Sequence, residues 1–151
     1  MTYRYQADPG CIERESFRRI RTCTELSGFD RVQQQVAMRV VHSAGIPALA
    51  SQLRFSAHAC TRGREALASA ADILCDVEMV RQGITRRLLV AEPRCFLREP
   101  EVPAIAEAAG ETRTMAALRL WQPYLAGSVV VIGNAPTALF RLLEMLEQGA
   151  P

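Results

Sequence analysis

Apolar residues in the first part of the chain recur at helical spacing. The Asp-Pro-Gly turn at residues 8–10 predicts the start of a helix that carries Phe17 on its apolar face and ends at residues 27–30. Asp30 is a typical N-cap for a second helix, and Gly45 supplies the stop of that helix. The beginning of the chain is therefore predicted to be helical.

Short apolar runs alternate with helical segments over the rest of the chain. The runs predict three strands, at residues 72–75, 94–97 and 128–132. Helices are predicted at residues 59–71, near 103, from 112 to 125 with a break at Pro123, and from 136 onward. This alternation predicts an α/β fold with a mainly parallel sheet covered on both faces. Sheets usually have about four to six strands, so either a further strand is hidden in the sequence or the chain lacks its end.

Composition restricts the class of protein. The 151 residues are 49% hydrophobic and 23% charged, which is typical of one soluble globular domain, residues 1–151. The formal charge of +2 is too small to indicate nucleic acid as a partner, and the arginines are dispersed. All 18 basic residues are Arg. This reflects either a base-composition bias or the use of guanidinium groups to bind carboxylates or phosphates.

The cysteines and the start of the chain indicate a reducing compartment. Five cysteines form an odd set without a C-x-x-C spacing, so they are predicted to be reduced thiols and no metal site is expected. The start of the chain has no apolar signal segment, and no run approaches the roughly 18 apolar residues that a membrane-spanning helix needs. We therefore expect a cytoplasmic protein with no membrane partner.

His42 is the first candidate for chemistry. It lies near the carboxyl end of the second predicted helix, where the helix dipole favours a positive charge by about 0.3–1 kcal/mol at an exposed site. Arg39, three residues earlier, shares its face of the helix. A cation beside a titratable ring suits an anionic substrate. The alternative is a histidine that only caps helix carbonyls, and His58 is expected to be no more than a surface or capping residue.

The turn at residues 133–137, Gly-Asn-Ala-Pro-Thr, is the strongest local signal. It follows a β-branched strand and precedes a helix, so its free amide groups are expected to face a ligand crevice at the carboxyl end of the sheet. Neither glycine-rich nucleotide motif is present. The sequence therefore predicts an anion-binding turn without a nucleotide fingerprint.

Three further polar pairs have two interpretations each. Thr112-Arg113 and Thr85-Arg86 either bind an anion at a helix start or act as a cap beside a solvated charge. Asp76 and Glu78, just beyond a strand, are either a catalytic carboxylate pair or caps of the next turn, and the cap is the favoured interpretation.

Five stretches of the chain are distinctive when taken together, namely ERESFRRIR, AMRVVHSAG, ILCDVEMVRQGITR, ETRTMAALRLW and GSVVVIGNAPTALFRLLEM. In their order and spacing they resemble one family, the precorrin-8X methylmutases of cobalamin biosynthesis. The resemblance covers essentially the whole chain. It implies a flavodoxin-like three-layer α/β/α fold and a homodimer. It also implies an isomerase that moves a methyl group from C11 to C12 of the corrin macrocycle of precorrin-8X, or of its cobalt-containing counterpart, to give hydrogenobyrinic acid, without an added cofactor.

The resemblance also assigns residues. The proton donor and acceptor falls on His42, and substrate contacts fall on Ser16 and Arg39, with Thr85, Arg113, Asn134 and Ala135 as further contacts. Members of the family continue with a further strand and a glycine-rich loop, so the resemblance implies that this chain is truncated at its C-terminus. The alternative is a non-catalytic or vestigial domain that binds corrinoids.

Overall fold

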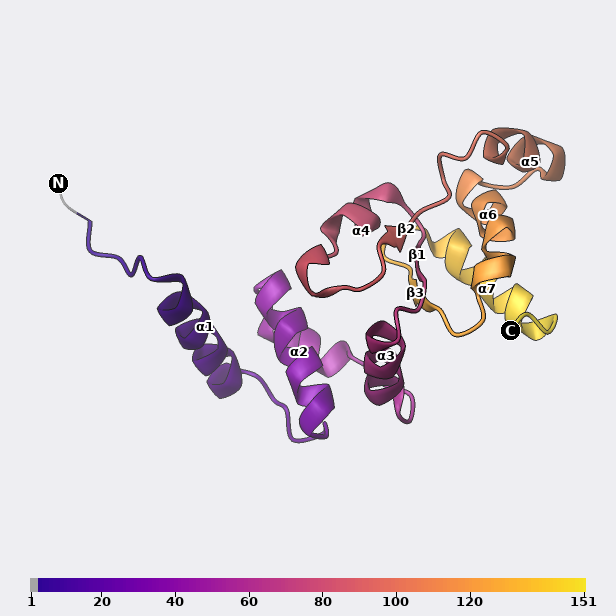
Figure 1. Ribbon diagram of the computed structural model, residues 1–151. Helices are drawn as coiled ribbons and strands as arrows, with labels where there is room; N and C mark the ends of the chain where they lie inside the picture. The colour runs from indigo at the N-terminus through magenta and orange to yellow at the C-terminus, as the bar shows by residue number, and fades with distance from the viewer. Residues whose placement is uncertain (1–2) are drawn as a thin grey trace. The chain divides into compact units, whose positions relative to one another are not determined.

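The computed structural model describes residues 3–151 and divides the chain into two compact units, Met1–Arg62 and Gly63–Pro151 (Figure 1). The first unit holds α1 (Pro9–Cys23), α2 (Arg31–Ala44) and the 3₁₀ helix η1 (Pro47–Gln52). Helix α3 (Ala59–Ala68) contains the boundary between the units.

Side-chain caps define the helices of the first unit. The Asp8 carboxylate accepts the Cys11 amide at the start of α1. Asp30 forms a capping box with Gln33 at the start of α2, and Gly45 ends that helix at φ 70°, a left-handed conformation that glycine adopts without strain. The predicted caps of α2 are confirmed. The predicted end of the first helix is wrong, because the backbone turns extended at Thr24, before residues 27–30.

The core of the first unit forms where α1 and α2 pack together. It consists of the buried side chains of Ile20, Leu26, Ala37, Met38, Val41 and Ala50. Phe17 and Phe29 are half-buried against this core. The helical spacing of apolar residues thus places one face of each helix inward and leaves the polar residues of the opposite faces in solvent.

A three-stranded parallel sheet forms the centre of the second unit. Its strands are β1 (Ile73–Cys75), β2 (Pro93–Arg94) and β3 (Val129–Val131), in the order β2-β1-β3. Ile73 pairs with both Pro93 and Val129, so the three carboxyl ends lie at one edge. The predicted α/β class and parallel sheet are confirmed. The second strand is shorter and begins one residue earlier than predicted, because only Pro93 and Arg94 pair with β1.

Helices cover the sheet of the second unit. They are α4 (Glu78–Gly83), η2 (Arg86–Leu88), α5 (Val102–Ala109), α6 (Arg113–Leu118), η3 (Arg119–Tyr124) and α7 (Pro136–Glu147). Figure 1 shows α4 on one side of the strands and α6 and α7 on the other. The segment predicted at residues 112–125 is interrupted as expected, but the α-helix ends earlier, at Leu118, and Pro123, which cannot donate a helical hydrogen bond, lies inside the 3₁₀ helix that follows. Within residues 3–151, no helix has the length and apolar character needed to cross a membrane.

Candidate functional site

His42 lies in the last turn of α2, where its ring is held by two consecutive residues of α1. The Ser16 hydroxyl is 2.9 Å from the ring nitrogen Nδ1. The Phe17 ring stacks on the imidazole, with centroids 4.9 Å apart and planes inclined by 18°. One contact fixes the rotation of the ring within its plane and the other fixes the plane itself. The His42 side chain is therefore exposed but oriented.

The Ser16 hydroxyl can stay hydrogen-bonded to His42 in both protonation states of the ring. A hydroxyl both donates and accepts, so it donates to Nδ1 of the neutral ring and accepts from Nδ1–H of the charged ring. Among the residues that the structure describes, Nε2 of His42 has no hydrogen-bond partner. The ring can therefore exchange a proton with a bound molecule at Nε2 while Ser16 holds Nδ1.

Arg39 lies beside this histidine, one helical turn earlier. Its Nη1 atom is 3.0 Å from a Glu13 carboxylate oxygen, and its guanidinium lies 4.5 Å from the centroid of the Phe17 ring. Both partners of the ion pair are more than half exposed, so the pair contributes only about 0–1 kcal/mol. A carboxylate of a ligand can displace Glu13 at little cost, and Arg39 then binds that carboxylate through its planar fork.

A groove of about 480 Å³ lies next to this group of side chains. Phe17, Val36 and Met38 give it apolar lining, and Arg21, Gln35 and Arg39 give it polar lining. The first unit thus combines an apolar surface, two guanidinium groups and an oriented imidazole. Such a combination suits a ligand with an apolar body and carboxylate substituents.

Replacing Ser16 by alanine tests whether the hydroxyl orients His42. We expect the turnover rate of a reaction that depends on proton transfer at His42 to fall about 2- to 10-fold. The reason is that a hydrogen bond with a net contribution of about 0.5–1.5 kcal/mol is lost. The matched control is Ser43→Ala, which removes a neighbouring hydroxyl that bonds only the Arg39 carbonyl, at 3.0 Å. Steady-state kinetics of both variants give the comparison. A Ser16→Ala rate equal to that of Ser43→Ala would show that the hydroxyl does not orient the ring.

The turn between β3 and α7 differs from the prediction. Its amide groups are not open to a ligand, because Oδ2 of Asp76 accepts the amides of Gly133, Asn134 and Ala135 at 3.3, 2.9 and 2.7 Å. The expected anion-binding turn is therefore wrong as stated, since the protein supplies the anion itself. The predicted cap of the next turn is wrong in its partner, because α4 has no side-chain cap and Oδ1 of Asp76 accepts only the adjacent Val77 amide, whereas Oδ2 binds the distant turn. Gly133 and Asn134 remain exposed, and Ala135 is buried.

Three threonine hydroxyls join the start of α6 to the start of α7. Thr112 caps α6, and its Oγ1 lies 3.0 Å from that of Thr114 and 3.2 Å from that of Thr137 in the first turn of α7. Arg113, exposed, follows the cap directly. These bonds place Arg113 and the Asn134 turn near two neighbouring helix starts.

Thr85 remains apart from these residues. It is exposed at the start of η2, and no hydrogen bond joins its side chain to another predicted site residue in the described part of the chain. The second unit therefore brings together Arg113 with Asn134 and Ala135, and the first unit brings together Ser16, Arg39 and His42.

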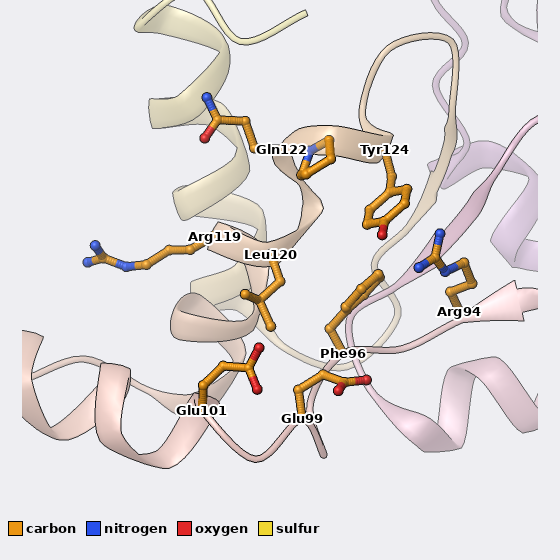
Figure 2. Close-up of a pocket in the computed structure, with 9 residues that line it drawn as sticks. Arg94, Phe96, Glu99, Glu101, Arg119, Leu120, Gln122 and Tyr124 are labelled. Atoms are coloured by element: carbon orange, nitrogen blue, oxygen red, sulfur yellow. The ribbon is translucent and has the colours of Figure 1, made fainter.

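A groove of about 620 Å³ in the second unit contains none of the predicted site residues (Figure 2). Arg94 stacks on Tyr124 at 3.7 Å from the ring centroid, lies 4.8 Å from that of Phe96 and is 3.2 Å from a carboxylate oxygen of Asp72. Figure 2 shows Arg94 beside the two rings, with Arg119 pointing away on the far side. Since Arg94 is already paired and stacked, we interpret this groove as a packing feature.

The cysteine at the end of β1 offers no nucleophile. Burial raises the pKa of the Cys75 thiol to about 11, and the side chain is 1% exposed. Burial also raises the pKa of Cys95. Both thiols therefore stay protonated at neutral pH, and the proton chemistry of the candidate site falls to His42.

Two features of the site were not predicted from the sequence. Phe17 was interpreted as part of the helix core, although its position next to Ser16 on a helix that faces α2 is a usable signal for a ring contact. The three amides that bind Asp76 belong to a segment 57 to 59 residues further along the chain, and local spacing cannot reveal such a contact.

Comparison with known proteins gives a consistent result. The family model described as Precorrin-8X methylmutase matches residues 11–151. A Precorrin-8X methylmutase of Pseudomonas aeruginosa is 50% identical over 97% of this chain and 72% of its own length, and one of Sinorhizobium sp is 49% identical over 99% and 72%. A solved structure of a precorrin-8X methyl mutase from Thermus thermophilus has a TM-score of 0.83 at 34% identity, over 93% of this chain and 70% of its own.

Proposed function

Since the chain belongs to the precorrin-8X methylmutase family, we propose that it is the isomerase of cobalamin biosynthesis that converts precorrin-8X to hydrogenobyrinic acid. The observation that carries the proposal is the oriented His42 ring, held at Nδ1 by Ser16 and stacked on Phe17, with Nε2 free among the described residues. This geometry fits a reaction in which the protein contributes one proton and a binding surface.

The reaction requires little covalent chemistry from the protein. The methyl group breaks its bond to C11 as it forms a bond to C12, and the product has the composition of the substrate. Any proton that His42 donates to the macrocycle is therefore returned within the cycle. A positioned imidazole typically contributes a factor of about 10²–10⁴. Holding the macrocycle in the reactive conformation contributes the rest, because the migrating group is already attached and needs no carrier.

We also propose a role in binding for the other residues that the resemblance assigns. Arg39 and Arg113 are exposed guanidinium groups, which suit the carboxylates of a corrinoid. Ser16, Thr85 and Asn134 offer uncharged polar groups. Ala135 is 8% exposed and gives its amide to Asp76, so its contribution is the shape of the turn.

The test is conversion of precorrin-8X followed by absorbance, because the product has a distinct conjugated chromophore. We expect the chain to form hydrogenobyrinic acid and to need neither added metal nor cofactor. The cobalt-containing substrate, run in parallel, determines which form is preferred. The competing proposal is a domain that binds corrinoids without converting them. Saturable binding of precorrin-8X without any spectral conversion would favour that second proposal.

A homodimer and a cytoplasmic location complete the proposal. Helix α7 leaves four large apolar side chains between 45% and 64% exposed, namely Leu139, Phe140, Leu143 and Leu146, and an exposed apolar face of this kind is compatible with a second copy. The five free cysteines fit a reducing compartment. Sedimentation equilibrium distinguishes a dimer from a monomer, and fractionation of cells locates the protein.

A further inference from the structure

Asp76 is the one charged side chain classed as buried in the described part of the chain, with 1% of its surface exposed. It follows β1 directly, at the carboxyl edge of the sheet. A buried carboxylate is costly unless its oxygens are bonded and its charge is balanced. No ion pair with an arginine balances Asp76 within residues 3–151, so its partners must be sought in the backbone.

Four backbone amides donate hydrogen bonds to the Asp76 carboxylate. Oδ1 accepts the amide of Val77 at 2.9 Å, and Oδ2 accepts those of Gly133, Asn134 and Ala135 at 3.3 Å or less. The last three amides are successive and lead into the twelve-residue helix α7, whose positive end also favours a negative charge. Asp76 thus holds the position that an external anion occupies in turns of this type.

The same turn is held from a second direction. A Cβ atom on Gly133 would lie 2.8 Å from a methyl carbon of Val80 in α4, so only glycine fits there without a shift. With the amides bound to Asp76 and the Cα of Gly133 against Val80, the backbone of the turn has little freedom. Gly133 and Asn134 are both exposed, and of these two only Asn134 carries a side chain.

We propose that Asp76 is a positioning residue: its carboxylate replaces a ligand anion on the amides of residues 133–135 and so sets the side chain of Asn134 for contact with the substrate. This inference rests on the proposed function for the contact between Asn134 and the corrinoid. The turn thus recognises its ligand through a side chain, and its amides serve only to fix that side chain.

Removing the carboxylate and supplying it again tests this role. We expect Asp76→Ala to raise KM for precorrin-8X about ten-fold, with a smaller change in kcat, because hydrogen bonds to a charged group are lost. Added formate fills the vacated anion position, lowers KM again and slows hydrogen exchange at the amides of residues 133–135. Asp76→Asn keeps the volume and should raise KM without responding to formate. Glu78→Gln, which removes a carboxylate that accepts from Arg81, is the control with unchanged KM.

A double variant separates positioning from general stability. Asp76→Ala combined with Asn134→Ala should have the KM of Asn134→Ala alone, because Asp76 acts through that side chain. A fall in thermal stability with unchanged KM in Asp76→Ala and Asp76→Asn would overturn the proposal.

The amide measurements stand apart from the proposed function. If the unmodified chain converts no precorrin-8X, the proposed function fails, and exchange at residues 133–135 then decides the role of Asp76. Faster exchange in Asp76→Ala that formate slows again supports the proposal, and unchanged exchange overturns it.

Discussion

Replacing His42 by asparagine should reduce conversion of precorrin-8X by about 10²–10⁴-fold, the usual contribution of a positioned general acid or base. Asparagine keeps a polar group near the Ser16 hydroxyl but cannot carry a proton. Because the ring is exposed but its replacement removes the stack on Phe17, we expect the free energy of unfolding to fall by about 0.5–1.5 kcal/mol. The affinity for hydrogenobyrinic acid should change little, since Arg39 remains.

The other histidine supplies the matched control for this experiment. His58 is exposed and adopts a left-handed backbone at φ 63°, which asparagine also tolerates. His58→Asn should therefore keep the unmodified rate. Initial rates by absorbance and product affinity by titration are the measurements. A His42→Asn rate within a factor of two of the His58→Asn rate would rule out the proton role.

Replacing Trp121 by alanine should have the largest effect on stability. The indole is 1% exposed and belongs to the core cluster of the second unit, so the expected loss is about 3–5 kcal/mol. Its Nε1–H donor has no acceptor among the described residues. Trp121→Phe removes that unbonded donor and keeps an aromatic ring, so we expect it to lie within about 1.5 kcal/mol of the unmodified chain.

Urea unfolding followed by far-UV circular dichroism measures both variants, because Trp121 is the only tryptophan of the chain and its fluorescence is lost. Equal midpoints for the alanine and phenylalanine variants would contradict the packing role of the indole. The comparison is independent of the enzymatic proposal, since Trp121 lies in the core.

Local patterns predicted the elements of the fold well. Asp30 and Gly45 bound α2 as expected, and Pro136 begins α7, because a proline at the first helical position loses no hydrogen bond. The strand at residues 94–97 was placed less well. Apolar character continues through Phe96, but Phe96 turns into the core by packing on Tyr124 and does not extend the ladder.

The site was predictable in parts. The helical spacing of Arg39 and His42 is a local property, and both side chains do lie at one place, around Phe17. The state of the turn at residues 133–135 depends on Asp76, which belongs to another strand end. A sequence shows that such a turn offers amides, whereas only the fold shows that they are already bound. For the same reason the sequence suggested an anionic ligand at a position where the protein provides the anion.

The most direct test of the account follows the migrating methyl group itself. Precorrin-8X labelled with ¹³C in the methyl group at C11 is incubated with the chain and observed by ¹³C NMR. We predict that the label appears quantitatively at C12 in hydrogenobyrinic acid, and that the His42→Asn variant leaves it at C11. A label that stays at C11 with the unmodified chain, or that leaves the macrocycle, would contradict the assignment of this protein as a methyl-shifting isomerase.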